Sequence, residues 1–277
     1  MIQLNSKKLR QLQMIQLEML IEVDRICKKH GIKYTIIGGT LLGAVRHGGF
    51  IPWDDDADVA MLRPEYKKFC RVCKEELDSN RFYFQNIDNT KGYRWGYAKL
   101  RRKGTLFLRE HQEHMEYKQG VFIDIFPIDA TPDNFILREI HNFKCFLVRK
   151  VLWSAVGQYA GKTKIERLIC RILYRIPEGT AKKMYKNLSI KKGANTSKIV
   201  RTLTFPAPKK IHGYYRKWFA ETVPISFEGF MFEGVKDYDG WLKFEFGDYM
   251  QMPPKSKRKA HPVSDIKLIE VEIEKRK

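Results

Sequence analysis

The amino-acid sequence predicts an α+β protein, because short β-like segments dominate its first half and helical periodicity dominates the part that follows. Runs of β-branched and aromatic residues recur up to residue 126, whereas residues 132–192 show the apolar spacing of helices. The chain has 277 residues, and its 43% hydrophobic content is enough for a substantial core. Charged residues make up 30% of the chain but are spread along it, which argues against extensive disorder.

Individual elements can be placed from periodicity and from helix-start signals. Periodic apolar residues predict an amphipathic helix at about residues 6–29, and Pro64 has the position at which proline favours the first turn of another helix. A further helix is expected near residues 237–246. Segments rich in β-branched and aromatic residues predict strands at 33–37, 58–62, 82–85, 95–101, 105–108 and 121–126.

Three aspartates at alternate positions, Asp54, Asp56 and Asp58, are the strongest chemical signal in the sequence. Asp58 continues into the apolar run 59–62, which predicts that the cluster lies at the start of a strand rather than in a solvated turn. Residues two apart on a strand project from the same face, so Asp56 and Asp58 should lie side by side. Paired carboxylates offer the oxygen ligands that Mg²⁺ prefers when it also binds a diphosphate.

Two further features extend the predicted site. Gly38 and Gly39 follow a predicted strand, where glycine lets the backbone approach a phosphate and a helix N-terminus supplies free N–H donors. Asp124 is the one acid in the apolar run 120–127. Burying an unpaired carboxylate is costly, so we expect Asp124 either to face a metal ion or another cation, or to act as a proton acceptor. Asp129 is a weaker candidate, because it follows a proline and can belong to a turn.

The charge balance is strongly positive, with 52 Lys and Arg against 32 Asp and Glu and a formal net charge of +20. Such a field concentrates anions, and composition alone leaves nucleic acid, anionic lipid and phosphorylated small molecules as candidates. Between residues 143 and 175, aromatic and aliphatic side chains are interleaved with lysine and arginine. A basic amphipathic helix of this kind can lie on an anionic membrane, and a helix with one buried and one solvated face is the alternative.

The expected compartment is the cytoplasm. The N-terminal segment lacks the continuous apolar stretch of a secretory signal, and five cysteines are an odd number in a chain large enough to need no disulfides. Cys70 and Cys73 form a lone C-x-x-C pair in a predicted helix, with no second pair and no nearby histidine. We therefore expect a buried helix face there rather than a metal or redox site.

The segment IIGGTLLGAVRHGGFIPWDDDADVAML, residues 36–62, resembles the signature of the LicD family of phosphotransferases. This family has a nucleotidyltransferase-like fold and includes bacterial phosphocholine transferases and fukutin-related ribitol-phosphate transferases. The resemblance spans roughly residues 8–262, and the helical part at about 132–200 is the least distinctive. No zinc-binding Cys/His set of the fukutin-related branch is visible. Supporting similarities are YAKLRRKGT at 97–105, GVFIDIFPID at 120–129 and FGDYMQMPPKSKR at 246–258.

The resemblance implies a nucleotidyltransferase-like mixed sheet with flanking helices and a mainly helical region. Residues 1–131 would form the catalytic core. Residues 132–200 would form a helical region that faces the acceptor or a membrane. Residues 201–277 would complete the fold and carry a basic tail.

The resemblance also implies an activity. Phosphocholine, or a related alcohol phosphate, would pass from a CDP-activated donor such as CDP-choline to a sugar hydroxyl of a cell-envelope glycan, with release of CMP. The acceptor can be lipid-linked, so the enzyme would work in the cytoplasm or as a peripheral protein on the inner face of the cell membrane.

The same resemblance assigns residues to this reaction. Asp56 and Asp58 would hold Mg²⁺ or Mn²⁺ with Asp54 assisting, and Asp124 would be a further ligand or the base for the acceptor hydroxyl. Arg46 and His47 also have purely structural roles open to them, because the arginine can pair with an aspartate and the histidine can cap its helix. Substrate contacts are expected from Gly38, Gly39, Thr40, Arg46, His47, Trp53, Lys99, Arg101, Lys257 and Arg258.

Two other functions remain open at this point. A nucleotidyltransferase would use the same aspartates but attack the α-phosphate of a nucleoside triphosphate and release pyrophosphate; the long PWDDDAD motif favours phosphotransfer instead. A basic nucleic-acid-binding protein would explain the charge but not the clustered aspartates, which repel phosphate in the absence of a metal ion. Nucleic acid is therefore not an expected partner.

Overall fold

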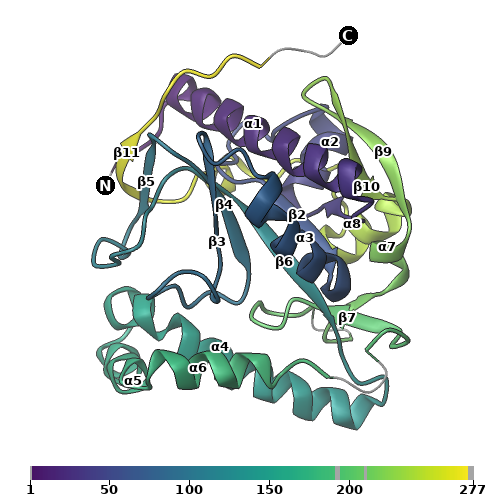
Figure 1. Ribbon diagram of the computed structural model, residues 1–277. Coiled ribbons are helices and arrows are strands. Elements are labelled where there is room, and N and C mark those ends of the chain that lie inside the picture. The colour runs from purple at the N-terminus through teal and green to yellow at the C-terminus, as the bar shows by residue number, and fades with distance from the viewer. Residues whose placement is uncertain (1, 191–193, 209–210, 274–277) are drawn as a thin grey trace.

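The computed structural model describes residues 2–190, 194–208 and 211–273 and shows a mixed sheet flanked by helices (Figure 1). A separate helical layer lies at one end of the sheet, at the bottom of the view. The sheet contains nine strands, and both parallel and antiparallel pairs occur in it. The predicted α+β class is confirmed.

The main path of the sheet mixes strands from both ends of the chain, because β1 pairs with β10. β7 (Ile199–Arg201) and β8 (Tyr214–Tyr215) extend it from β6, and β5 (Leu106–Arg109) pairs with β11 (Val263–Lys267) in a small second sheet. The order along the main path is β3 (Phe82–Gln85), β4 (Ala98–Arg102), β6 (Phe122–Ala130), β2 (Asp58–Leu62), β1 (Thr35–Ile36), β10 (Phe230–Val235) and β9 (Thr222–Phe227).

The first and last of the helices around the sheet begin and end close to the predicted positions, and a third begins beside Pro64 as predicted. α1 (Ser6–His30) begins after Asn5, whose side chain accepts a hydrogen bond from the N–H of Lys8, and it ends at Gly31 in the left-handed conformation. Its apolar face packs on the sheet (Figure 1). The other helices of this part are α2 (Gly38–His47), α3 (Arg63–Glu76), α7 (Lys217–Ala220) and α8 (Tyr238–Phe246).

The helical layer consists of α4 (Phe135–Ala160), α5 (Lys164–Tyr174) and α6 (Glu178–Lys186). It has a small core of its own, in which Cys145 and Leu152 of α4 pack with Tyr185 of α6 and with Tyr93 from the loop before β4. None of the described helices combines the length and the apolar composition that are needed to cross a bilayer.

β6 is longer than predicted, because it continues past Pro127 to Ala130. Proline is tolerated there because β4 pairs with β6 only as far as Ile125, so no hydrogen bond to β4 is lost. The turn considered for Asp129 is therefore wrong. Asp129 lies within β6 and is buried.

Asp129 instead connects the sheet to the helices. Its carboxylate accepts a hydrogen bond from Arg63 Nε at 2.8 Å, and Arg63 Nη2 donates to the hydroxyl of Tyr185 at 3.0 Å. The ion pair thus joins β6, the start of α3 and α6. Cys70 and Cys73 also lie on α3, where Cys73 is buried and Cys70 is partly buried.

We predict that Asp129→Ala lowers the free energy of unfolding by about 3 kcal/mol, because it leaves the Arg63 charge buried without its partner. The matched control is Asp88→Ala, since Asp88 pairs with Lys182 of α6 at 2.8 Å but is 55% exposed. That change should cost less than about 1 kcal/mol. Urea unfolding followed by circular dichroism measures both, and equal small losses would contradict the structural role of Asp129.

Candidate active site

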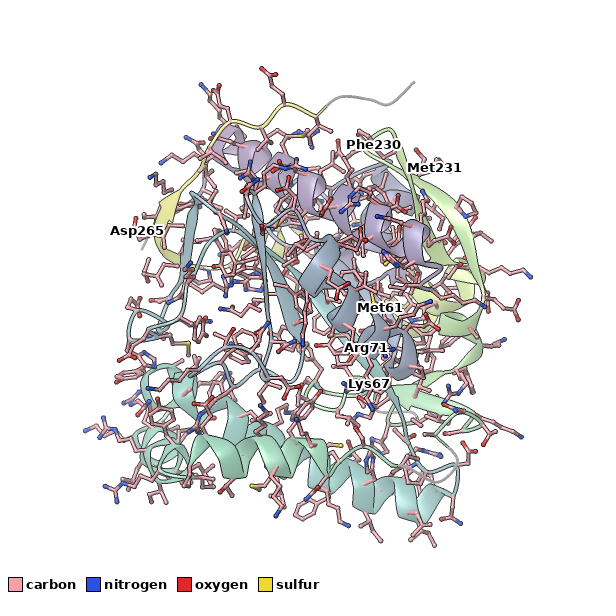
Figure 2. The ribbon with its side chains drawn as sticks, viewed as in Figure 1. Met61, Lys67, Arg71, Phe230, Met231 and Asp265 are labelled. Atoms are coloured by element: carbon pink, nitrogen blue, oxygen red, sulfur yellow. The ribbon has the colours of Figure 1, made fainter. Side chains whose placement is uncertain are left out.

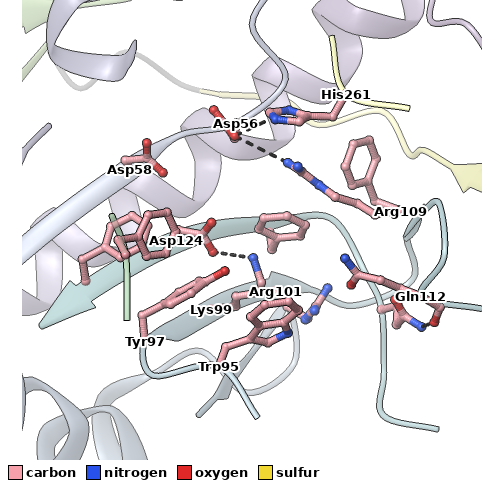
Figure 3. A pocket seen from close by; sticks show the side chains of 15 residues that line it. Asp56, Asp58, Trp95, Tyr97, Lys99, Arg101, Arg109, Gln112, Asp124 and His261 are labelled. Carbon is pink, nitrogen blue, oxygen red and sulfur yellow. Dashed lines mark hydrogen bonds and ion pairs between the residues drawn. The ribbon is translucent and has the colours of Figure 1, made fainter. Parts of the chain in front are cut away.

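A cavity of about 260 Å³ opens beside the start of β2, and acidic, basic and aromatic side chains line it (Figure 3). The lining residues come from β2, β4, β5 and β6, from the loops before β2 and β4 and between β5 and β6, and from the segments after β7 and before β11. They are Asp56, Asp58, Trp95, Tyr97, Lys99, Arg101, Phe107, Arg109, Gln112, Gln119, Phe122, Asp124, Phe126, Phe205 and His261.

Strand register brings the central residues together. Asp58 on β2 is directly opposite Asp124 on β6, and Asp124 is directly opposite Lys99 on β4. Paired residues on adjacent strands project from the same face, so the three side chains form a row. Lys99 Nζ lies 2.5 Å from Asp124 Oδ1, which gives Asp124 the cation partner that its buried position requires.

The first turn of α2 lies against two of the carboxylates. Gly38 has φ of +60°, and a Cβ on it would lie 2.9 Å from Asp58 Oδ2. A Cβ on Gly39 would lie 2.3 Å from Asp54 Oδ2. Thr40 Oγ1 accepts a hydrogen bond from the backbone N–H of Asp58 at 2.8 Å. The glycines therefore begin a helix, as the sequence analysis expected, and they also leave space for carboxylates, which it did not identify.

Burial and neighbouring carboxylates disfavour the ionisation of Asp54 and Asp58. Burial, assisted by Asp56 and Asp55, raises the pKa of Asp54 to about 8. Burial raises the pKa of Asp58 well above its usual value, and Asp56 and Asp124 raise it further. Among the described residues, no Lys, Arg or His lies within ion-pair distance of the Asp58 carboxylate. Close carboxylate oxygens, of which those of Asp58 have no ion-pair partner among the described residues, fit a divalent metal ion.

Three residues that the sequence analysis missed lie on the other side of Asp56. Asp55 is 1% exposed and accepts hydrogen bonds from the backbone N–H of His261 at 3.1 Å and from its Nδ1 at 2.8 Å. Arg109 Nη2 lies 3.5 Å from Asp56 Oδ2 and 3.7 Å from Asp55 Oδ2. Burial alone would raise the pKa of Asp55, but His261 and Arg109 lower it overall.

Asp55, Asp56 and His261 are close enough to share a metal ion, since one ligand atom of each lies within 4.8 Å of the others. The guanidinium of Arg109 is at the same place, however, and it already supplies positive charge to both aspartates. The Asp58 carboxylate has no cation within ion-pair distance among the described residues, and Lys99, which pairs with Asp124, only partly offsets the rise in its pKa. We therefore assign the better metal position to the side of the cavity near Asp58.

Basic side chains form the opposite wall. Burial lowers the pKa of Lys99 to about 7 although Asp124 opposes the shift. Lys99 Nζ also lies 3.3 Å from the centroid of the Phe122 ring. Arg101 is buried and donates to Gln85 Oε1 and to the carbonyl oxygen of Gly120, each at 2.7 Å. Lys99 and Arg101 both line the cavity, and the contact with substrate that the sequence analysis expected of them stays a prediction.

The remaining predicted substrate contacts do not line this cavity. Arg46 and His47 lie at the C-terminal end of α2, and Arg46 Nη1 donates to the carbonyl oxygen of Tyr249 at 2.7 Å. The His47 and Trp53 rings are 6.2 Å apart, and the Arg258 guanidinium lies 5.1 Å from the Trp53 ring. The exposed Lys257 is next to Arg258 in the chain. These residues form a second cluster, and their role in substrate binding stays a prediction.

Comparison with known proteins adds an independent observation. Residues 31–146 match the family described as LicD/FKTN/FKRP, nucleotidyltransferase domain. The chain is 29% identical over 265 residues to the lipopolysaccharide cholinephosphotransferase LicD of Haemophilus influenzae, which covers 93% of this chain and 97% of that protein.

Two further similarities cover shorter parts of the chain. Over 31 residues the chain is 55% identical to the ribitol 5-phosphate transferase FKRP of Homo sapiens, which covers 11% of this chain and 6% of that protein. A protein of Rickettsia prowazekii is 23% identical over 151 residues, 54% of this chain and 51% of its own length. Together with the family match and the long alignment to LicD, these findings confirm the resemblance to the LicD family that is seen in the sequence.

Proposed function

We propose that this protein is a metal-dependent phosphotransferase that moves an alcohol phosphate from a CDP-activated donor to a hydroxyl of a cell-envelope glycan and releases CMP. The observation that carries the proposal is one cavity in which Asp56, Asp58 and Asp124 face Lys99 and Arg109. Similarity over 93% of the chain to a cholinephosphotransferase supports phosphocholine as the alcohol phosphate.

The carboxylates on the Asp58 side would hold Mg²⁺ or Mn²⁺, with Asp56 and Asp58 as the main ligands and Asp54 assisting. When bound, such an ion neutralises diphosphate oxygens and charge that develops on them. This assignment also accounts for the cluster itself. Buried carboxylates that raise one another's pKa are costly to hold together unless a cation compensates them.

The protein's own cations would act on the leaving group. In the proposed reaction the acceptor hydroxyl oxygen bonds to the phosphorus of the alcohol phosphate, and the bond from that phosphorus to the oxygen of CMP breaks. Lys99 and Arg109 line the cavity and would stabilise the negative charge that CMP carries away. Asp124 would complete the ligand set or accept the proton of the acceptor hydroxyl.

Aromatic side chains at one end of the cavity favour choline among the alcohols. The rings of Trp95 and Tyr97 are 6.1 Å apart, and the rings of Tyr97 and Phe205 are 5.3 Å apart. A quaternary ammonium group binds to such faces by cation–π attraction, whereas ribitol or glycerol has no charge to offer. A lipid-linked glycan acceptor would place the enzyme at the inner face of the cell membrane, where we propose that it acts.

The donor and the direction of transfer can be tested with two labels. CDP-choline labelled in choline or in cytosine would be incubated with Mg²⁺ and with envelope glycan from a strain that lacks the gene. We expect the choline label on the glycan and the cytosine label in free CMP, because the bond to CMP breaks. CDP-ribitol, CDP-glycerol and CTP are the comparison donors. Cytosine label on the glycan, or transfer from CTP with release of pyrophosphate, would establish a nucleotidyltransferase instead.

We predict that Asp58→Asn reduces turnover more than about 100-fold, because even the outer partners of metal ligands are worth about 10–100-fold. The same change should abolish Mn²⁺ binding measured by electron paramagnetic resonance while the thermal unfolding midpoint does not fall. Asp265→Asn is the matched control, since Asp265 is exposed on β11 (Figure 2) and does not line the cavity. A wild-type rate in Asp58→Asn would overturn the site assignment.

A further inference from the structure

Exposed apolar side chains are concentrated on the helical layer. Thirteen of the twenty large hydrophobic side chains that are exposed among the described residues lie between residues 135 and 174. This is the segment that the sequence analysis expected to have either a buried apolar face or a membrane-facing one. The helices do bury one face, but a second apolar face remains in solvent, where contiguous apolar surface is characteristic of an interaction site.

α5 shows the arrangement most clearly. Its exposed stripe consists of Ile165, Leu168, Ile169 and Ile172, which are 51–71% exposed and recur at helical spacing. The opposite face holds the helix in place, because Cys170 is 2% exposed and lies against Gly157 of α4. The stripe is therefore not the side on which α5 packs against the protein.

Basic residues flank this stripe. At about 100° per residue, Lys164, Arg171 and Arg175 project together from one side of the apolar stripe of α5. All three are exposed, and no ion pair with an acidic side chain is found for any of them in the described parts of the chain. α5 thus has an apolar centre and a basic margin.

The first half of α4 repeats the pattern. Ile136, Ile140, Phe143 and Leu147 recur at helical spacing and are 45–68% exposed, and the exposed Lys144 lies beside them. Over residues 135–175 the chain has nine Lys and Arg against two Asp and Glu. Both helices therefore combine exposed apolar stripes with an excess of positive charge.

We propose that the exposed stripes of α4 and α5, with their basic margins, form a docking surface for a bilayer that contains anionic lipid. Burial of the isoleucine, leucine and phenylalanine side chains among acyl chains and attraction of the basic margin to lipid phosphates would act together. A second copy of the chain fits less well, because it would bring two positive faces together. Nucleic acid would use the charge but leave the apolar stripes exposed.

The helices that carry the docking surface also line a cavity beside the proposed site of transfer. A second cavity, of about 570 Å³, is lined by Leu152 and Trp153 of α4 and also by Trp95, Tyr97 and Phe205. The last three residues line the catalytic cavity as well. Docking through α4 and α5 would thus bring the aromatic end of the catalytic cavity close to the membrane surface, where a lipid-linked acceptor would be found.

The test is binding of the full-length protein to vesicles of equal parts phosphatidylcholine and phosphatidylglycerol, compared with phosphatidylcholine alone, by flotation. We expect binding to the anionic vesicles. The double change Ile165→Ser with Ile172→Ser should weaken it at least about 10-fold, because both side chains would leave the acyl region. The double change Arg171→Gln with Arg175→Gln should weaken it about 5-fold per charge.

The matched control is Met231→Ser with Met250→Ser, which removes two apolar side chains of similar exposure elsewhere; Met231 lies on β10, away from the helical layer (Figure 2). It should bind like the wild type. Failure of the wild type to bind anionic vesicles overturns the proposal, as does equal weakening by the control. A dimer that the isoleucine changes dissociate, with no vesicle binding, would assign the surface to a second copy. Vesicle binding needs neither donor nor acceptor, so its outcome is independent of the proposed transfer reaction.

Discussion

The close approach of four carboxylates is the constraint on which the site and much of the surrounding fold depend. Parallel pairing of β2 with β6 makes Asp58 and Asp124 direct neighbours, and the loop before β2 brings Asp54 and Asp56 to the same place. Such a cluster lowers stability unless it is compensated, because buried like charges oppose one another. Lys99 compensates the charge of Asp124, whereas the carboxylate of Asp58 is left without an ion-pair partner among the described residues and is suited to bind a cation.

The same constraint explains the backbone around the cluster. Carboxylate oxygens occupy the space where side chains of residues 38 and 39 would otherwise be, so the first turn of α2 can be built only from glycine there. The Thr40 hydroxyl then fixes the backbone N–H of Asp58. The Gly-Gly-Thr motif and the aspartate motif are therefore parts of one packing arrangement, although they are separated in the sequence.

Features set by local pattern could be predicted from the sequence, whereas features set by distant contacts could not. β2 and β3 have the predicted bounds, because compact β-rich runs there are limited by glycine, proline or polar residues. The contact between Asp55 and His261 joins residues 206 positions apart, and no local pattern marks either as a partner. Proximity in the chain was also misleading: Arg46 follows Gly39 by only seven positions, but the rise of the helix over those positions separates them by about 10 Å.

The middle of the chain was ambiguous for a physical reason. Amphipathic periodicity shows that a helix has an apolar face, but it does not show whether protein or another apolar phase covers that face. In α5 the covered side is narrow and centred on Cys170, while the isoleucine-rich stripe is open. α4 also contributes Leu152 and Trp153 to a cavity that shares aromatic lining residues with the catalytic cavity. The membrane or other surface on which α4 and α5 dock would therefore also influence which acceptor reaches Asp124. In the proposed enzyme, acceptor choice would then depend on the helical layer, and the chemistry of transfer on the sheet.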